Sequence, residues 1–138
     1  MTTENKTTFK NFGISFQQKL AQIILEERTF ADRIEEVLDD SYFDVQYLRL
    51  IVREIFKYKE KYKLHPSHDA ISTIFRTEIQ EESEVLIKQV RAFLVRIYKS
   101  HVEDADFVKE TALDFAKRQK LKEAMIKSIS LLQKSSFD

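Results

Sequence analysis

Glycine, proline and cysteine are nearly missing from this sequence, whose 138 residues contain one glycine, one proline and no cysteine. Glycine and proline usually make up about 7% and 5% of a protein and form most tight turns. A many-stranded sheet joined by hairpins therefore lacks the residues that it needs. Without cysteine the chain can form no disulfide, thiolate nucleophile or cysteine-ligated zinc site. The composition predicts an all-α fold.

Long apolar runs and an excess of either charge are also missing. No stretch approaches the roughly 18 consecutive apolar residues of a membrane span. The 23 basic and 23 acidic residues cancel, unlike the basic balance typical of proteins that bind nucleic acid. A single glycine rules out a P-loop within this chain. We therefore expect a cytoplasmic protein that contacts no membrane, contacts little nucleic acid directly, is not an enzyme and holds no cofactor.

The charges are segregated along the chain. Residues 26–44 carry a net charge of −6, residues 49–63 carry +4, and residues 117–127 again carry +4. Patches of opposite sign favour docking between proteins. The alternative is that these are solvated helix faces on which like charges happen to cluster.

Apolar residues at spacings of three and four predict a series of helices. Ser15 and Gln18 match a capping box, which predicts the start of the first helix. A long helix is expected from Asp44 to the basic turn before Pro66, and Ser67 is expected to open the next one. This part of the chain, residues 14–79, is predicted to form a compact helical head after a flexible N-terminal tail, residues 1–13.

The chain changes character after residue 84. The apolar face over residues 85–98 is wider than one packing stripe requires, so this helix is expected to have two neighbours. Residues 104–134 contain no glycine or proline, and as one helix they would extend about 45 Å, beyond the diameter of a small domain. We therefore expect residues 84–138 to form a long antiparallel helical hairpin that projects from the head as an arm.

The apolar stripe of such an arm needs a partner, because an isolated hairpin covers too little of it. A second copy of the chain is the expected partner. The candidate residues of this self-association interface are Val90, Phe93, Leu94, Ile97, Phe107, Phe115, Leu121 and Met125.

Basic and aromatic residues alternate before Pro66, as they do in proteins that bind single strands. The candidate patch for a partner or for nucleic acid is Lys57, Lys59, Lys61 and Lys63. The alternative is that Tyr58 and Tyr62, one helical turn apart, pack inward while the lysines extend into solvent. His65, His68 and Asp69 flank Pro66 but lack the four-residue spacing of a two-histidine metal helix, so no metal site is expected.

The order of these features resembles the N-terminal domain of DnaB-like replicative DNA helicases, most closely those of bacteriophages. The matching stretches are ISFQQKL at 14–20, Tyr42 and Phe43 before the long helix, Pro66 and Ser67, and the pattern from 107 to 132 that includes FVKE, DF, QKLKEA and LL. The resemblance covers residues 12–138 and includes no catalytic signature.

The resemblance implies a head and hairpin that assemble with copies of themselves, as a dimer, a trimer of dimers or a hexamer, into a collar on one face of a helicase ring. In this family the collar contacts primase or a helicase loader, whereas ATP, magnesium and DNA translocation belong to a C-terminal RecA-like motor. No motor follows residue 138 here, so we expect a fragment of such a protein. The alternative is a free-standing helical adaptor or regulator that binds a replication protein.

Overall fold

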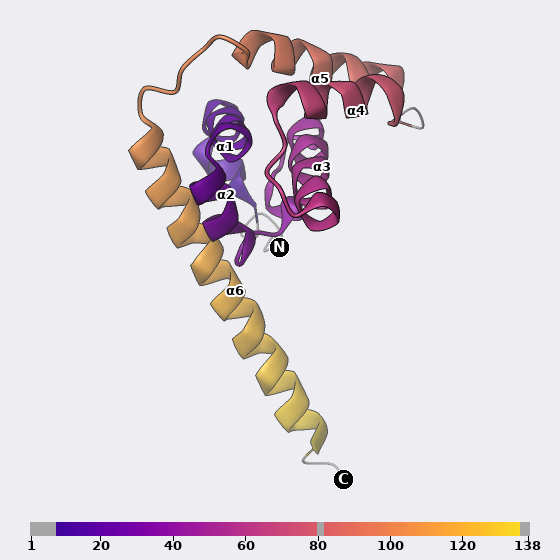
Figure 1. Ribbon diagram of the computed structural model, residues 1–138. Coiled ribbons are helices and arrows are strands. Elements are labelled where there is room, and N and C mark those ends of the chain that lie inside the picture. Colours follow the sequence, from indigo (N-terminus) through magenta and orange to yellow (C-terminus); the bar gives the residue numbers. More distant parts are fainter. Residues whose placement is uncertain (1–7, 80–81, 136–138) are drawn as a thin grey trace.

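The computed structural model describes residues 8–79 and 82–135, and every regular element in these ranges is helical (Figure 1). In chain order the elements are η2 (Phe9–Phe12), α1 (Ile14–Glu26), α2 (Arg28–Glu35), η3 (Asp40–Tyr42), α3 (Gln46–Tyr62), α4 (His68–Thr77), α5 (Glu84–Ile97) and α6 (Ala105–Ser135). The prediction of an all-α chain is confirmed.

Short polar side chains start two of the helices, because the first backbone N–H groups of a helix lack partners within it. The Ser67 hydroxyl accepts a hydrogen bond from the backbone N–H of Ala70 at 3.0 Å, which opens α4 as predicted. The Ser83 hydroxyl does the same for Leu86 at the start of α5. At the C-terminal end of α3, Lys63 takes the left-handed conformation, with φ of 58°, and ends the helix before Pro66.

The capping box predicted at Ser15 and Gln18 is wrong. Helix α1 begins at Ile14 with Gly13 as its N-cap, and no side chain caps it. Gly13 has φ of 92°, a conformation that glycine adopts without steric cost. Gln18 instead donates a hydrogen bond to the Tyr47 hydroxyl of α3 at 2.8 Å. Its side chain therefore joins two helices and does not close one helix end.

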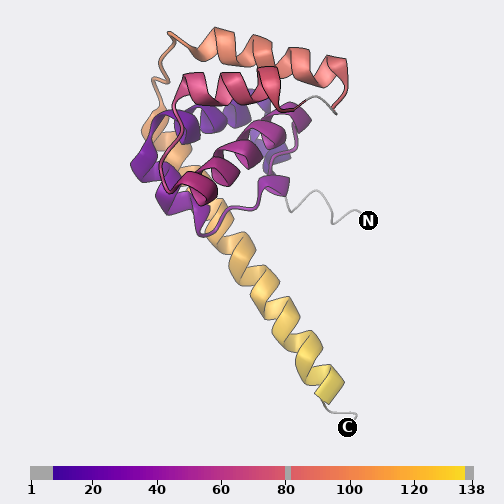
Figure 2. The ribbon, with the colours of Figure 1, turned by 45° about the vertical axis from the view of Figure 1, so that its right-hand side comes forward.

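Helix α1 lies at the centre of the core and packs against α2, α3 and α6 (Figures 1 and 2). Leu20, Ile23 and Ile24 are fully buried, and the polar side chains of Gln17 and Gln22 are buried beside them. The Gln17 carbonyl oxygen accepts hydrogen bonds from the backbone N–H groups of Asp44 and Val45 at 2.8 and 3.1 Å. Gln17 thus attaches the segment that precedes α3 to the central helix, α1.

The flexible tail predicted for residues 1–13 is wrong for residues 8–13, while residues 1–7 lie outside the described residues. Phe9 in η2 is fully buried and contacts the rings of Phe16, Phe43 and Phe115 at centroid distances between 4.8 and 6.0 Å. Aromatic pairs in this distance range stabilise a core beyond their buried area alone. The segment before α1 is therefore part of the core.

The antiparallel hairpin predicted for residues 84–138 is not confirmed. Helix α5 packs against α3 and α4, whereas α6 packs against α1 and α2, and a connection over residues 98–104 separates them (Figures 1 and 2). Helix α5 has the two neighbours that its wide apolar face predicts, but both belong to the head. The head consequently extends beyond residue 79 to include α5 and the first half of α6.

Helix α6 is half packed and half free. Its first part buries Val108, Ala112, Leu113 and Ala116 against the head. Every residue from 120 to 135 is exposed, and this part of the helix extends away from the body in both ribbon views (Figures 1 and 2). We call residues 120–135 the projecting segment. The sequence predicted a long helix that extends beyond the domain, and the second half of α6 does so.

Within the described ranges, none of the helices combines the length and the apolar character needed to cross a lipid bilayer.

Candidate interaction site

The projecting segment carries large apolar side chains that the chain itself leaves in solvent. Each of its six large apolar side chains is more than half exposed: Leu121, Met125, Ile126, Ile129, Leu131 and Leu132. Leu121, Met125, Ile129 and Leu132 follow one another at spacings of four, four and three, so they lie along one face of the helix. We call these four residues the seam. A contiguous exposed apolar face of this kind marks an interaction surface.

Two hydrogen bonds between side chains hold α6 against the head. The Tyr42 hydroxyl of η3 donates a hydrogen bond to a Glu123 carboxylate oxygen at 3.1 Å, and burial together with this carboxylate raises the pKa of Tyr42. Nearer the start of α6, the Lys109 ammonium bonds Glu27 at 2.9 Å, and this hydrogen bond raises the pKa of Lys109. Helix α6 is therefore fixed to the head by one contact with η3 and one with Glu27, the residue between α1 and α2.

The eight residues predicted for self-association differ in their exposure to solvent. Val90, Phe93, Leu94 and Ile97 of α5 are buried in the chain's own core. Phe115 is partly buried and packs on Phe9. The other three, Phe107, Leu121 and Met125, are exposed on α6. The four α5 residues thus have a structural role, and the exposed part of the predicted interface lies on α6.

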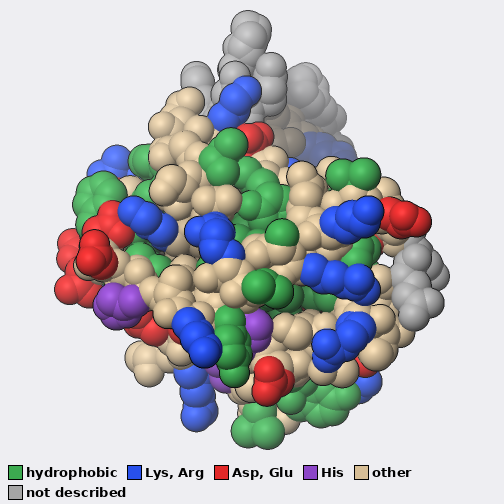
Figure 3. Space-filling view, turned by 90° about the horizontal axis from the view of Figure 1, so that it is seen from above, with side chains coloured by type: hydrophobic (Ala, Val, Ile, Leu, Met, Phe, Trp, Pro, Cys, Tyr) green, Lys and Arg blue, Asp and Glu red, His purple; other side chains and the backbone are tan. Residues whose placement is uncertain are grey.

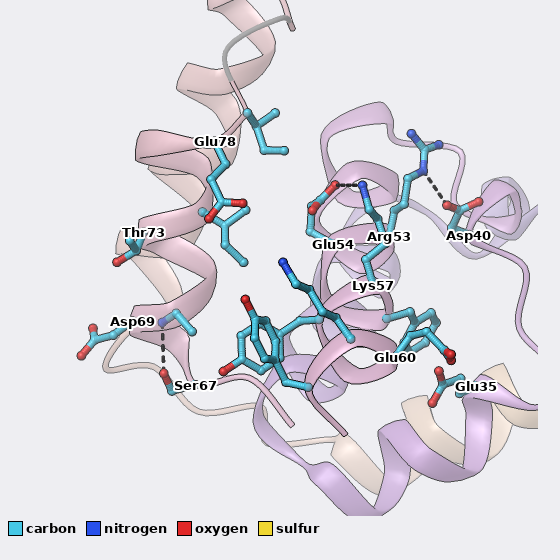
Figure 4. A pocket seen from close by; sticks show the side chains of 17 residues that line it. Glu35, Asp40, Arg53, Glu54, Lys57, Glu60, Ser67, Asp69, Thr73 and Glu78 are labelled. Atoms are coloured by element: carbon cyan, nitrogen blue, oxygen red, sulfur yellow. Dashed lines mark hydrogen bonds and ion pairs between the residues drawn. The ribbon is translucent and has the colours of Figure 1, made fainter. Parts of the chain in front are cut away.

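A groove separates α3 from α4 (Figure 4). It has a volume of about 1120 Å³, and we call it the α3–α4 groove. Its apolar lining comes from Phe56, Tyr58 and Tyr62 on the α3 side and from Ala70, Ile74 and Ile79 on the α4 side. Tyr58 and Tyr62 contact each other at a centroid distance of 4.6 Å, and Tyr62 remains half exposed. The tyrosines therefore form a wall of the groove, and the inward packing considered from the sequence is only partly realised.

The groove also has charged edges. Six acidic side chains and three basic ones line it, a net charge of −3: Glu35, Asp40, Glu54, Glu60, Asp69 and Glu78 against Arg53, Lys57 and Lys61. Two of the bases are already paired, since Arg53 bonds Asp40 at 2.7 Å and Lys57 bonds Glu54 at 3.4 Å (Figure 4). Glu35 and Glu60 also form ion pairs, with Lys59 at 3.6 Å and Lys63 at 3.4 Å, so four of the six acids are compensated by a neighbouring base.

The four candidate lysines do not form one basic patch. Lys57 and Lys61 line the α3–α4 groove, whereas Lys59 and Lys63 line a separate hollow beside α2. Lys59 forms ion pairs with Asp32 and Glu35, and its hydrogen bond holds the pKa of Asp32 below the usual value. Lys63 pairs with Glu60 at 3.4 Å. Neighbouring carboxylates thus neutralise much of the charge that a phosphate backbone would need.

A different basic surface was missed by the sequence reasoning, which used α5 only for its apolar residues. Lys88, Arg91 and Arg96 of α5 and the following Lys99 are exposed together with Val95. Figure 3 looks down on this end of the molecule, where Lys and Arg side chains surround apolar ones. The recurrence of basic residues at helical spacing was the available signal.

The histidines near Pro66 act as structural links. His65 Nε2 lies 2.6 Å from the backbone carbonyl oxygen of Leu25, and His68 Nε2 lies 2.7 Å from that of Leu94. These hydrogen bonds attach the α3–α4 connection to α1 and the start of α4 to α5. Among the described residues, no group of three or more histidine, aspartate or glutamate side chains has the geometry to hold a metal ion.

Comparison of the chain with protein-family models, with curated proteins and with solved structures gives no match.

Proposed function

We propose that this chain is a non-catalytic assembly domain of a phage-type replicative DNA helicase, in which copies join into a collar that docks primase or a helicase loader. The observation that carries the proposal is the projecting segment, whose seam of four large apolar residues has no cover within the described chain. The resemblance noted in the sequence supplies the choice of helicase. ATP and magnesium would belong to the motor of the parent protein.

In this proposal α6 pairs with a helix of another copy, and not with α5 of its own chain as the hairpin prediction had it. Helix α5 is occupied by α3 and α4, so the projecting segment finds no helix of its own chain beside it. Coverage of an amphipathic helix by another subunit is a common way to bury such a face. The segregated charge of the chain would help to orient the partners as they meet.

The first test is the mass of the purified chain in solution, measured by light scattering across a range of concentrations. We expect a multiple of 16.4 kDa that dissociates in Met125→Asp and Leu132→Asp, because both substitutions put a charge into the seam. Ser130→Asp is the matched control, since Ser130 lies on the opposite face of the same helix. Phe93→Ala would be uninformative, because Phe93 is buried in the core.

The second test concerns the partner. A parent helicase with Met125→Asp and Leu132→Asp is expected to lose stable rings and its response to primase, whereas the Ser130→Asp parent keeps both. Unchanged rings and an unchanged primase response would overturn the proposal. A chain that stays monomeric at every concentration yet binds primase through the seam would favour the adaptor instead.

A further inference from the structure

The outward face of α5 carries charge of one sign. Residues 85–102 contain four basic residues and no acidic one, although the whole chain is electrically balanced. We call Lys88, Arg91, Arg96 and Lys99 the α5 basic face, and all four side chains are exposed. The surface of a soluble domain ordinarily mixes both signs. The charge balance of the whole chain, from which we expected little contact with nucleic acid, therefore does not hold on this helix.

The α5 basic face is not neutralised within the described part of the chain. None of its four side chains forms an ion pair there, whereas Lys19, Lys59 and Lys109 on other helices each pair with an acid. The Arg96 guanidinium lies over the Phe93 ring, 5.3 Å from its centroid, and this contact leaves the N–H groups at its edge able to donate. The face therefore presents cations to an external anion.

The four cations lie along one side of the helix. Lys88 and Lys99 share a line with Ala92 and Val95, at successive spacings of four, three and four, and the two arginines flank this line. From Lys88 to Lys99 the line extends about 16 Å at about 1.5 Å per residue. One strand of B-form DNA presents about five phosphates over that length. Figure 3 shows this end of the molecule, with Lys and Arg side chains around apolar ones.

Arg76 of α4 extends the positive surface. Together with Lys88 and Arg91 it lines a hollow of about 350 Å³ between α4 and α5. Glu82 and Glu84 also line this hollow. The positive surface therefore ends at the start of α5 and runs from there towards Lys99.

The chemistry of the face suits a phosphate backbone better than a protein partner. The large apolar side chains of α5 are buried in the chain's own core: Leu86, Val90, Phe93, Leu94 and Ile97. Between the cations the outward face offers Ala92 and Val95, which are too small to form the apolar centre of a protein interface. Phosphate contacts need no apolar centre, because cationic side chains make them directly to backbone oxygens.

The acidic stretch of another copy is a poor match for this face. Residues 26–44 contain eight acids. Four of them already form ion pairs within the chain: Glu27, Asp32, Glu35 and Asp40. A fifth, Asp39, accepts a hydrogen bond from the backbone N–H of Ser41. A dense row of unpaired negative charge must therefore come from a different molecule.

Tyr98 adds a stacking surface beside the cations. Its side chain is 58% exposed at the end of α5, and its ring lies edge-on to that of His68 with the centroids 4.9 Å apart. The bases of a single strand stack on exposed aromatic rings of this kind. The bases of a duplex already stack on one another, so Tyr98 favours a single strand.

We propose that the α5 basic face binds the phosphate backbone of a single-stranded nucleic acid, with a base stacked on Tyr98. This goes beyond the proposed function, since assembly through the seam on α6 does not require it.

Fluorescence anisotropy of a labelled oligothymidylate, titrated with the full chain at several salt concentrations, tests the proposal. Four phosphate contacts on a single strand predict a slope of about −3 for the logarithm of the binding constant against that of the salt concentration. Arg91→Gln with Lys99→Gln should reduce the slope to about −1.5 and weaken binding at low salt about tenfold.

The matched control removes an equal charge from the candidate patch on α3. Lys57→Gln with Lys61→Gln should leave the slope and the affinity at their wild-type values. No binding at low salt, or a wild-type slope in the variant of Arg91 and Lys99, would overturn the proposal.

The kind of polymer is tested with the same assay. Tyr98→Ala should weaken binding of the single strand about tenfold, whereas Tyr98→Phe keeps the ring and should bind as the wild type does. A duplex of the same length should bind more weakly than the single strand. Equal or tighter binding of the duplex, or an unchanged affinity in Tyr98→Ala, would overturn the assignment to a single strand. Polyglutamate that displaces the label as well as unlabelled oligothymidylate does, at equal charge, would overturn nucleic acid as the occupant and indicate an acidic protein.

Discussion

Single buried polar residues fix how the helices of this protein meet. Gln17 is almost fully buried and accepts hydrogen bonds from two backbone N–H groups that lead into α3. Gln22, also buried, donates to the backbone carbonyl oxygen of Ser100 on the connection before α6 at 3.2 Å. Because a buried polar group without a partner is costly, each glutamine stabilises one arrangement of its neighbours over others.

Gln17→Leu is expected to lower the free energy of unfolding by about 2 kcal/mol, because the N–H groups of Asp44 and Val45 lose their acceptor. Urea denaturation followed by circular dichroism measures the change. Gln89→Leu, an exposed position on α5, is the control and should alter stability by less than about 0.5 kcal/mol. Equal effects at the two positions would contradict the role given to Gln17.

Acid should weaken the contact between α2 and α3. The hydrogen bond from Lys59 lowers the pKa of Asp32 below its ordinary value of 3.8, so the folded state favours the ionised carboxylate. This contribution to stability is present above pH 3.8 and is lost as the pH falls through the lowered pKa of the folded state. Asp39, whose pKa is lowered mainly by the backbone N–H of Ser41, adds to the same acid-sensitive window.

Asp32→Asn is expected to be less stable than the wild type at pH 7 and to lose less stability between pH 5 and about pH 2, because it has no carboxylate to protonate there. Thermal unfolding measured across this range checks the prediction. If the wild type and Asp32→Asn lose the same stability over this pH range, the hydrogen bond between Lys59 and Asp32 does not stabilise the folded state. Asp114→Asn, on the exposed face of α6, controls for a general change in surface charge.

At the scale of elements, the sequence predicts where helices lie better than it predicts what they touch. Ser67 opens α4 and Pro66 follows α3, as expected, because these signals act within a few residues of the helix end. The partners of α5 could not be read in the same way. An apolar face indicates only that it is covered, and the covering helices α3 and α4 come from earlier in the chain.

The short element η2 is expected to contribute to stability despite its place near the start of the chain. Phe9→Ala should lower the free energy of unfolding by about 3 kcal/mol, since it leaves a cavity among aromatic rings in the core. Phe12→Ala removes a partly exposed ring from the same element and should cost about 1 kcal/mol. Chemical denaturation of both variants compares them, and equal losses would place Phe9 outside the core.

At the scale of the whole molecule, the protein combines a packed body with a helix that half leaves it. The body buries α1 on several sides, while residues 120–135 have no side chain buried at all. An isolated stretch of helix of this length is only marginally stable in water, because its stability ordinarily comes from a packed face. The segment therefore gains stability when another chain covers its seam.

Amide hydrogen exchange should detect this gain. At low protein concentration, residues 120–135 are expected to exchange fast while α1 exchanges slowly, and the segment should become protected as the concentration rises. Leu132→Asp should abolish this protection, and protection of the segment that is independent of concentration would contradict the prediction.

The helical class, the apolar stripe from Leu121 to Leu132 and the segregation of charge can be read from the amino-acid sequence, because they follow from composition and from spacing along one helix. Tertiary structure decided which apolar residues remain available. Val90, Phe93, Leu94 and Ile97 carry the same kind of pattern as the seam, yet α3 and α4 cover them and nothing in the described chain covers the seam. Burial depends on contacts between segments distant in the chain, and the periodicity of a single helix does not specify those contacts.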